Sequence, residues 1–140
     1  MATVFTRIID GELPGRFVWR DDRCVAFLSI NPLAPGHTLV VPRAEIDHWL
    51  DLDPALATHC FEVARGIGAA QMDAFSPPRV GLLIAGFEVP HTHLHVVPTR
   101  SMADLEFANA DPSPAAEALD AAAEKLRGAL AARGHREATA

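Results

Sequence analysis

The sequence is poor in cysteine, in lysine and in long apolar runs, and each shortage excludes a class of protein. Two cysteines in 140 residues cannot build a disulfide scaffold, so Cys24 and Cys60 are expected to be reduced thiols in the core. Lys125 is the single lysine among twelve basic residues, eighteen residues are acidic, and the net charge is −6. With no basic cluster, the chain is not expected to bind polymeric nucleic acid, because that binding depends on neutralised phosphates.

Apolar residues are spread along the chain and do not form a membrane segment. No window approaches the ~20 consecutive apolar residues that a membrane-spanning helix needs. The amino-terminal segment carries charges at Arg7, Asp10 and Glu12, so it lacks the apolar region of a signal peptide. We therefore expect no membrane partner and a cytoplasmic location. Hydrophobic residues make up 49% and charged residues 21% of the chain, which is ordinary for one globular domain.

Local patterns predict a single α+β domain. From Pro54 to Phe75 apolar residues recur every three or four positions, which predicts a helix with Asp53 as its N-cap. A second, alanine-rich helix is predicted at about 113–133, with Gly134 just past its end. Because regular alternation of strands and helices is absent, the strands are expected to form an antiparallel sheet. The predicted strands are 16–20, 24–30, 37–42, 80–86 and 92–98.

Three of the seven histidines stand two residues apart in the segment HTHLHVV, at His91, His93 and His95. Side chains at i, i+2 and i+4 of a strand share one face, so the spacing predicts three aligned imidazoles. One interpretation is a metal site, but the three positions span roughly 13 Å, which is wide for one zinc ion with bonds of ~2.0–2.1 Å. The other is a nucleophilic imidazole whose neighbours orient it and stabilise charge, which needs no metal.

This segment resembles the histidine triad family, whose pattern is His-φ-His-φ-His-φ-φ with φ apolar. Thr92 stands in the first φ position. Three other segments carry the resemblance in order along the chain: FTRIIDGELP, DDRCVAF and NPLAPGHTLVVPR, the last of which contains His37. The likeness covers a core of about residues 4–100 and leaves the carboxy-terminal helix outside it. A histidine at the third triad position, instead of glutamine, points to the hydrolase branches of the family.

The resemblance implies a role for each of several residues. His93 would attack the α-phosphorus of a nucleoside phosphoramidate, adenylate or dinucleoside polyphosphate, and water would then hydrolyse the nucleotidyl-imidazole. His95 would contact the phosphate and the leaving group, and His91 and His37 would complete the polar network. Backbone amides from Gly86 to Val89 would bind the non-bridging oxygens.

The resemblance also suggests a general acid and a pocket for the nucleobase. Glu88 lies three residues before the triad and would donate a proton to a departing amine if it were buried; the alternative is a solvated turn carboxylate. The apolar pocket for the base would come from Phe5, Ile8, Phe27 and Ile30, which could otherwise be plain core.

The chain departs from the family pattern in three places. Ser29 stands where relatives present an aspartate to the ribose hydroxyls, and serine is a weaker, uncharged acceptor. The loop before the triad, LLIAGFEVPH, is short and has Phe87 in a glutamine position. Many bacterial members hold a structural zinc through a Cys-x-x-Cys pair, and Thr3 and Thr6 occupy those positions here. We therefore expect no zinc and no cofactor.

The sequence thus predicts an α+β domain over residues 1–140, with a five-stranded antiparallel sheet and two main helices. The family pairs this fold into a homodimer with a ten-stranded sheet, which would also protect a strand edge. The predicted function is hydrolysis or transfer at the α-phosphate of a small nucleotide. Two alternatives stay open: a nucleotide-binding or regulatory module with little turnover, and a metal-dependent hydrolase that uses the histidine cluster. His48, His59 and His135 are expected to be structural or exposed.

Overall fold

The computed structural model describes residues 2–140 and confirms the predicted α+β fold with a five-stranded antiparallel sheet. The strand order is β1-β2-β3-β5-β4. The strands are β1 (Phe17–Arg20), β2 (Cys24–Leu28), β3 (Thr38–Pro42), β4 (Arg79–Leu83) and β5 (Leu94–Thr99). The helices are α1 (Val4–Ile9), α2 (Pro54–Phe75) and α3 (Ala116–Ala132), with short 3-10 helices at Trp49–Asp51, Met102–Leu105 and Phe107–Asn109.

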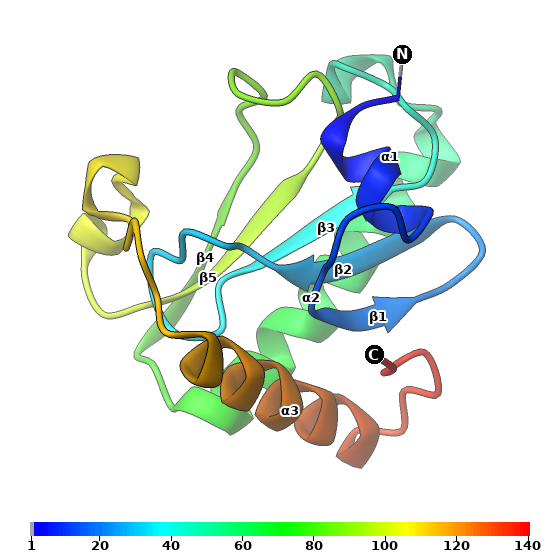
Figure 1. The fold of residues 1–140 in the computed structure, drawn as a ribbon. Coiled ribbons are helices and arrows are strands. Elements are labelled where there is room, and N and C mark those ends of the chain that lie inside the picture. The colour runs from blue at the N-terminus through cyan, green and yellow to red at the C-terminus, as the bar shows by residue number, and fades with distance from the viewer. Residues whose placement is uncertain (1) are drawn as a thin grey trace.

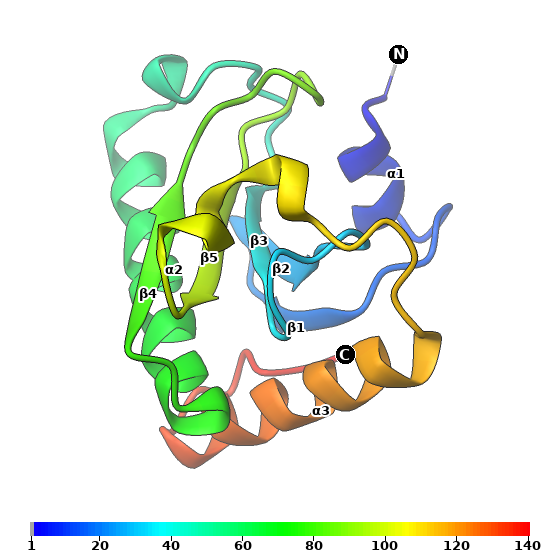
Figure 2. The ribbon, with the colours of Figure 1, turned by 90° about the vertical axis from the view of Figure 1, so that its left-hand side faces the viewer.

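Helices cover both faces of the sheet (Figures 1 and 2), and the strand side chains alternate between two apolar clusters. On β2, Cys24 and Ala26 belong to the cluster under α2 and α3, whereas Val25 and Phe27 belong to the cluster under α1. On β5, Leu94 and Val96 face α2. His95 lies between them in sequence and therefore faces the α1 side, which is where the site is built.

The structure confirms the predicted boundaries of α2. The Asp53 carboxylate accepts a hydrogen bond from the Ala55 amide at 3.2 Å, and Pro54 takes the first helical position. Ser76 ends the helix in a left-handed conformation, with φ +50°. Helix α3 begins at Ala116, three residues later than predicted, and its N-cap position is held by Ala115, which makes no side-chain cap.

The sequence prediction is wrong at the ends of two strands. It placed strands at 80–86 and 92–98, but β4 ends at Leu83 and β5 begins at Leu94. The amide and the hydroxyl of Thr92 both donate to the Ile46 carbonyl, at 2.7 and 2.8 Å, and this long-range contact takes the segment out of the strand ladder. Only His95 of the three histidines therefore lies within a strand.

Helix α3 packs into the same core as α2 and the sheet. Leu119, Leu126 and Leu130 are buried against residues of β1, β2 and α2. Burying a leucine side chain contributes about 1.5–3 kcal/mol relative to leaving it exposed. The carboxy-terminal helix is thus an integral part of the domain, although it lies beyond the region of resemblance. Within residues 2–140, none of the helices combines the length and the apolar character needed to cross a membrane.

Candidate active site

The hydrogen bonds of His93 leave one of its ring nitrogens ready to act as a nucleophile. His93 Nδ1 lies 2.7 Å from the His91 carbonyl oxygen, and because a carbonyl only accepts, Nδ1 carries the proton. Nε2 of the neutral ring therefore keeps its lone pair. Burial lowers the pKa of His93 below its usual value, so the ring is neutral at pH 7.

A second chain of hydrogen bonds determines the proton position on His95. The Leu33 amide donates to His37 Nδ1 at 3.0 Å, so His37 carries its proton on Nε2 and donates it to His95 Nδ1, also at 3.0 Å. His95 consequently carries its own proton on Nε2 and is a hydrogen-bond donor. Burial, reinforced by neighbouring imidazoles, lowers the pKa of His37 to about 4 and that of His95 to about 3.

His91 is fully buried and has both ring nitrogens engaged. Nε2 donates to the Pro42 carbonyl at 2.7 Å, and Nδ1 accepts from the Thr3 hydroxyl, also at 2.7 Å. This residue is not among those that line the site cavity. His91 and His93 precede strand β5, so strand alternation does not place them. Their rings nevertheless lie on the α1 side, because both contact Phe5 and the His93 ring meets the His95 ring at a centroid distance of 4.9 Å. His91 instead braces the backbone whose carbonyl orients His93.

A cavity of about 650 Å³ opens beside His93 and His95. Its apolar wall includes Phe5, whose ring meets the His93 ring edge-on at a centroid distance of 4.9 Å. Cavities of this size suit small-molecule ligands such as a mononucleotide. The sequence-predicted residues that line it are Phe5, Ile8, Phe27, Ser29, Ile30, His37, Glu88, Val89, His93 and His95.

The positions of Glu88 and Gly86 differ from what their predicted roles require. Glu88 lines the cavity but is exposed, so the burial on which a proton-donor role was conditioned is not present. Gly86 lies outside the cavity lining, in a left-handed conformation with φ +93°, within the loop before the triad. Such a conformation favours glycine and lets the loop turn toward Val89, which does reach the cavity.

The sequence analysis missed one wall of the site, which comes from the carboxy-terminal third of the chain. The Phe107 ring meets the His95 ring at a centroid distance of 5.0 Å, and Leu119 of α3 also lines the cavity. The Asn31 side chain donates to the Asp111 carbonyl at 3.1 Å, which holds this segment against the loop after β2. No local pattern marks Phe107 as a site residue, because its position beside His95 results from packing between segments far apart in sequence.

The positions of the family's zinc pair do not fit a metal. Thr3 caps α1 by accepting the Thr6 amide at 3.1 Å, and its hydroxyl bonds to His91. Neutral hydroxyls lack the thiolate charge that favours zinc. Among residues 2–140, the three triad histidines do not form a group whose ligand atoms lie close enough together for one ion. Both ring nitrogens of His91 are also taken by hydrogen bonds.

The remaining three histidines lie outside the cavity lining. His48 is exposed and its ring accepts the Leu50 amide at 3.2 Å. His59 contacts the Asp21 carboxylate at 2.7 Å. The His135 ring packs edge-on against Trp19, at a centroid distance of 5.1 Å.

Comparison with known proteins identifies the family of this chain. The family profile described as HIT domain matches residues 10–102. An uncharacterized HIT-like protein of Borreliella burgdorferi is 39% identical over 102 residues, which is 68% of this chain and 73% of that protein. The adenylylsulfatase HINT3 of Arabidopsis thaliana is 33% identical over 103 residues, which is 69% of this chain and 52% of that protein.

Solved structures show the same architecture. A zinc-bound histidine triad family protein from Mycobacterium smegmatis superposes with a TM-score of 0.81 and 28% identity, and the match covers 96% of both chains. The family match spans more than half of the sequence and includes His37 and the three triad histidines. The chain therefore belongs to the histidine triad (HIT) family.

Proposed function

We propose that this protein is a nucleotide hydrolase that acts at the α-phosphate of a nucleoside phosphoramidate, an adenylate or a dinucleoside polyphosphate, through a covalent intermediate on His93. The observation that carries the proposal is the protonation of His93: Nδ1–H is held by the His91 carbonyl, and Nε2 keeps a lone pair beside a nucleotide-sized cavity. The similarity to a plant adenylylsulfatase supports chemistry of this kind.

In the first step, His93 Nε2 attacks the α-phosphorus, and the bond to the leaving group breaks with its electron pair leaving on that group. The phosphorylated ring becomes cationic, and its Nδ1–H bond to the His91 carbonyl stabilises that charge. His95, the neighbouring imidazole, donates from Nε2 to the phosphate or to the departing atom as negative charge develops. A departing amine also needs a proton, which water in the open cavity supplies, because Glu88 at the rim is exposed and lacks the burial that a proton-donor role requires.

In the second step, water attacks the phosphorus, the P–N bond breaks with its electron pair on Nε2, and the proton of the water passes to solvent. His93 therefore leaves as a neutral imidazole. The low pKa of His93 favours this release, because the ring does not need to hold a proton on Nε2 at neutral pH. The apolar wall of Phe5 and Phe27, whose rings meet edge-on at a centroid distance of 5.6 Å, would accept the base. The proposed reaction uses groups of the chain alone.

A nucleotide-binding module with little turnover is the second candidate. It is favoured by Ser29, whose hydroxyl accepts the Asn31 amide at 3.3 Å and carries no charge for the ribose. The metal-dependent alternative is not proposed, because both ring nitrogens of His91 are used in hydrogen bonds and, within residues 2–140, the ligand atoms of the triad do not gather around one point.

The test is hydrolysis of an adenosine phosphoramidate by the wild-type protein and by His93→Ala. We expect kcat/KM to fall by at least about a thousandfold in the variant, as is common when a nucleophile is removed. His135→Ala is the matched control, because this histidine packs on Trp19 outside the cavity, and it should retain activity. Equal binding of the nucleotide by both proteins without wild-type turnover would favour the binding module, and the absence of both would overturn the proposal.

A further inference from the structure

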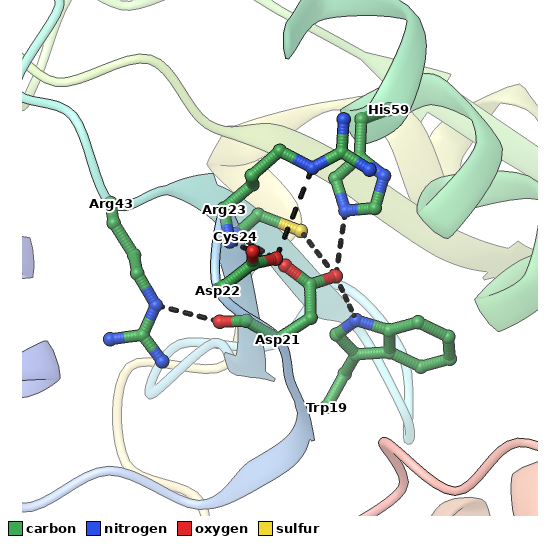
Figure 3. Close-up of polar contacts among 7 residues, drawn as sticks. All are labelled: Trp19, Asp21, Asp22, Arg23, Cys24, Arg43 and His59. Atoms are coloured by element: carbon green, nitrogen blue, oxygen red, sulfur yellow. Dashed lines mark hydrogen bonds and ion pairs between the residues drawn. The ribbon is translucent and has the colours of Figure 1, made fainter.

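A second cluster of metal-ligating side chains lies at the turn between β1 and β2 (Figure 3). Asp21 is in the turn, Cys24 begins β2, and His59 projects toward them from α2. One ligand atom from each lies within 4.8 Å of the other two. None of the three lines the cavity beside His93, so the cluster is separate from the proposed active site.

The Asp21 carboxylate is surrounded by donors. Its Oδ1 accepts the amides of Arg23 and Cys24, at 2.8 and 2.7 Å. Its Oδ2 accepts Trp19 Nε1–H at 2.8 Å and His59 Nε2–H at 2.7 Å, and the Cys24 thiol points at the same atom from 3.6 Å. Three donors thus converge on one oxygen that has two lone pairs. The thiol contact is the longest of the three.

One cation in place of the His59 Nε2 proton and the Cys24 thiol proton would relieve the crowding of donors around Asp21 Oδ2. Around a tetrahedral zinc ion with bonds of ~2.0–2.3 Å, ligand atoms lie roughly 3.3–3.8 Å apart. The present separation of Asp21 Oδ2 from Cys24 Sγ, 3.6 Å, lies in that range, and its separation from His59 Nε2, 2.7 Å, is shorter. All three ligand atoms lie within 4.8 Å of one another. Side-chain movements of about 1 Å would therefore be enough to form the site.

The chemistry and the charge of the three ligand side chains select the class of ion. A thiolate, an imidazole and a carboxylate together favour zinc and similar divalent transition metals over magnesium or calcium. A divalent ion with one carboxylate and one thiolate is electrically neutral, which suits a site whose cysteine is fully buried. The His59 and Asp21 side chains are 19% and 12% exposed and provide a route from solvent.

We propose that Asp21, Cys24 and His59 bind one zinc-class divalent ion, with water in the fourth position, and that the ion fastens the β1–β2 turn to helix α2. On binding, the Cys24 thiol loses its proton to solvent, and the His59 ring proton moves by solvent exchange from Nε2 to Nδ1 so that Nε2 can ligate. The side chains of the two arginines drawn in Figure 3 do not bind the three ligand atoms. Arg43 donates to the Asp21 backbone carbonyl, and the Arg23 side chain pairs with Asp22. The site is structural, and it does not depend on the proposed hydrolase activity.

The test uses cobalt(II) as a spectroscopic probe with the full-length protein freed of metal by a chelator. We expect one cobalt per chain, with the visible bands of tetrahedral coordination and a thiolate charge-transfer band in the near ultraviolet. His59→Gln is the principal variant, because the glutamine amide can still donate to Asp21 but does not replace the imidazole ligand. It should keep its fold, as judged by circular dichroism, and lose stoichiometric cobalt binding. Cys24→Ser should lose the charge-transfer band.

His93→Ala is the control variant and should bind cobalt like the wild type, because the triad lies elsewhere. Zinc should raise the Tm of the wild type and leave that of His59→Gln unchanged, since a ligand stabilises only the form that binds it. The proposal is overturned if the wild type shows no thiolate band at equimolar cobalt, or if the band survives in folded His59→Gln. Loss of the band in His93→Ala would equally overturn it, by locating the ion at the triad.

Discussion

For individual residues, the decisive property is which ring nitrogen of each histidine carries the proton. His93 is oriented by a carbonyl two residues away, a contact that the local backbone can supply by itself. His95 is oriented by His37, which is 58 positions away, and His37 in turn by the Leu33 amide. Because Nδ1 of His37 and Nδ1 of His95 each accept a hydrogen bond, these two histidines fit their places only as neutral rings. Protonating them inside the fold would break these contacts.

This arrangement predicts acid sensitivity. His37 and His95 have folded pKa values of about 4 and 3, below the 6.5 expected for an exposed ring, so their stabilising effect is complete above pH 6.5. It is lost as pH falls toward the folded values, because the unfolded chain then binds more protons. The free energy of unfolding should fall by up to about 1.4 kcal/mol per pH unit for each proton taken up.

Urea unfolding at pH 7, 6 and 5 measures this slope. His37→Gln removes one of the titrating groups and should give a shallower pH dependence than the wild type, even if the variant is less stable at pH 7. An identical slope in the two proteins would contradict the assignment of acid sensitivity to these buried rings. The window above pH 5 avoids most carboxylates, since Asp21, for example, has its pKa lowered to about 2 by the donors around it.

Among the secondary-structure elements, α3 has two roles. Its buried side has Leu126 and Leu130 in the core, and its first turns bring Leu119 to the cavity wall. Arg16, another cavity residue, pairs with Asp120 of this helix at 2.7 Å. The helix therefore couples the stability of the domain to the shape of the site, although the predicted family core ended near residue 100.

Two substitutions in α3 should act in opposite directions. Leu126→Ala should lower the free energy of unfolding by about 2–5 kcal/mol, because it leaves a cavity at a fully buried position. Gly128→Ala should raise it by about 0.5–1 kcal/mol, because a Cβ there meets nothing within 4 Å and alanine favours the helix. Denaturant unfolding measures both. Equal effects of the same sign would show that α3 does not pack as described.

In the assembled domain, the two edges of the sheet differ. On β1, the backbone amide of Arg20 donates to the Glu137 carbonyl at 3.0 Å, so the carboxy-terminal tail covers that edge. On the opposite side, β4 is the outer strand and carries the exposed apolar side chain of Leu82, and those of Phe61 and Met72 lie beside it on α2. We propose β4 as the edge that would pair in the ten-stranded sheet of a homodimer.

Leu82→Lys tests this assembly. It places a charge in the apolar patch and should shift the protein from dimer to monomer in sedimentation velocity. Leu50→Lys introduces the same charge at another exposed leucine outside the patch and should leave the association state unchanged. A wild-type protein that is monomeric at micromolar concentration would contradict the dimer, and a dimeric Leu82→Lys would exclude β4 as its interface.

The local sequence accounts for much of the fold, because the spacing of apolar residues and the helix-capping residues can be recognised within a few positions. The bounds of α2 follow from its apolar repeat and from Asp53, and the α+β class follows from the short apolar runs. Helix α1 was not predicted, since six residues are too few to show a repeat. The strand boundary at Leu94 was misplaced because the deciding hydrogen bonds reach Ile46, far away in the chain.

The sequence by itself determined the family, the fold class and the identity of the histidines and apolar residues around the candidate site, because these depend on residue type and spacing. Only the tertiary structure decided which nitrogens carry protons, that Phe107 and α3 complete the cavity, and that Asp21, Cys24 and His59 meet. The physical reason is that hydrogen bonds and packing across the sheet join segments tens of residues apart. Such contacts leave no periodic trace in the residues that form them.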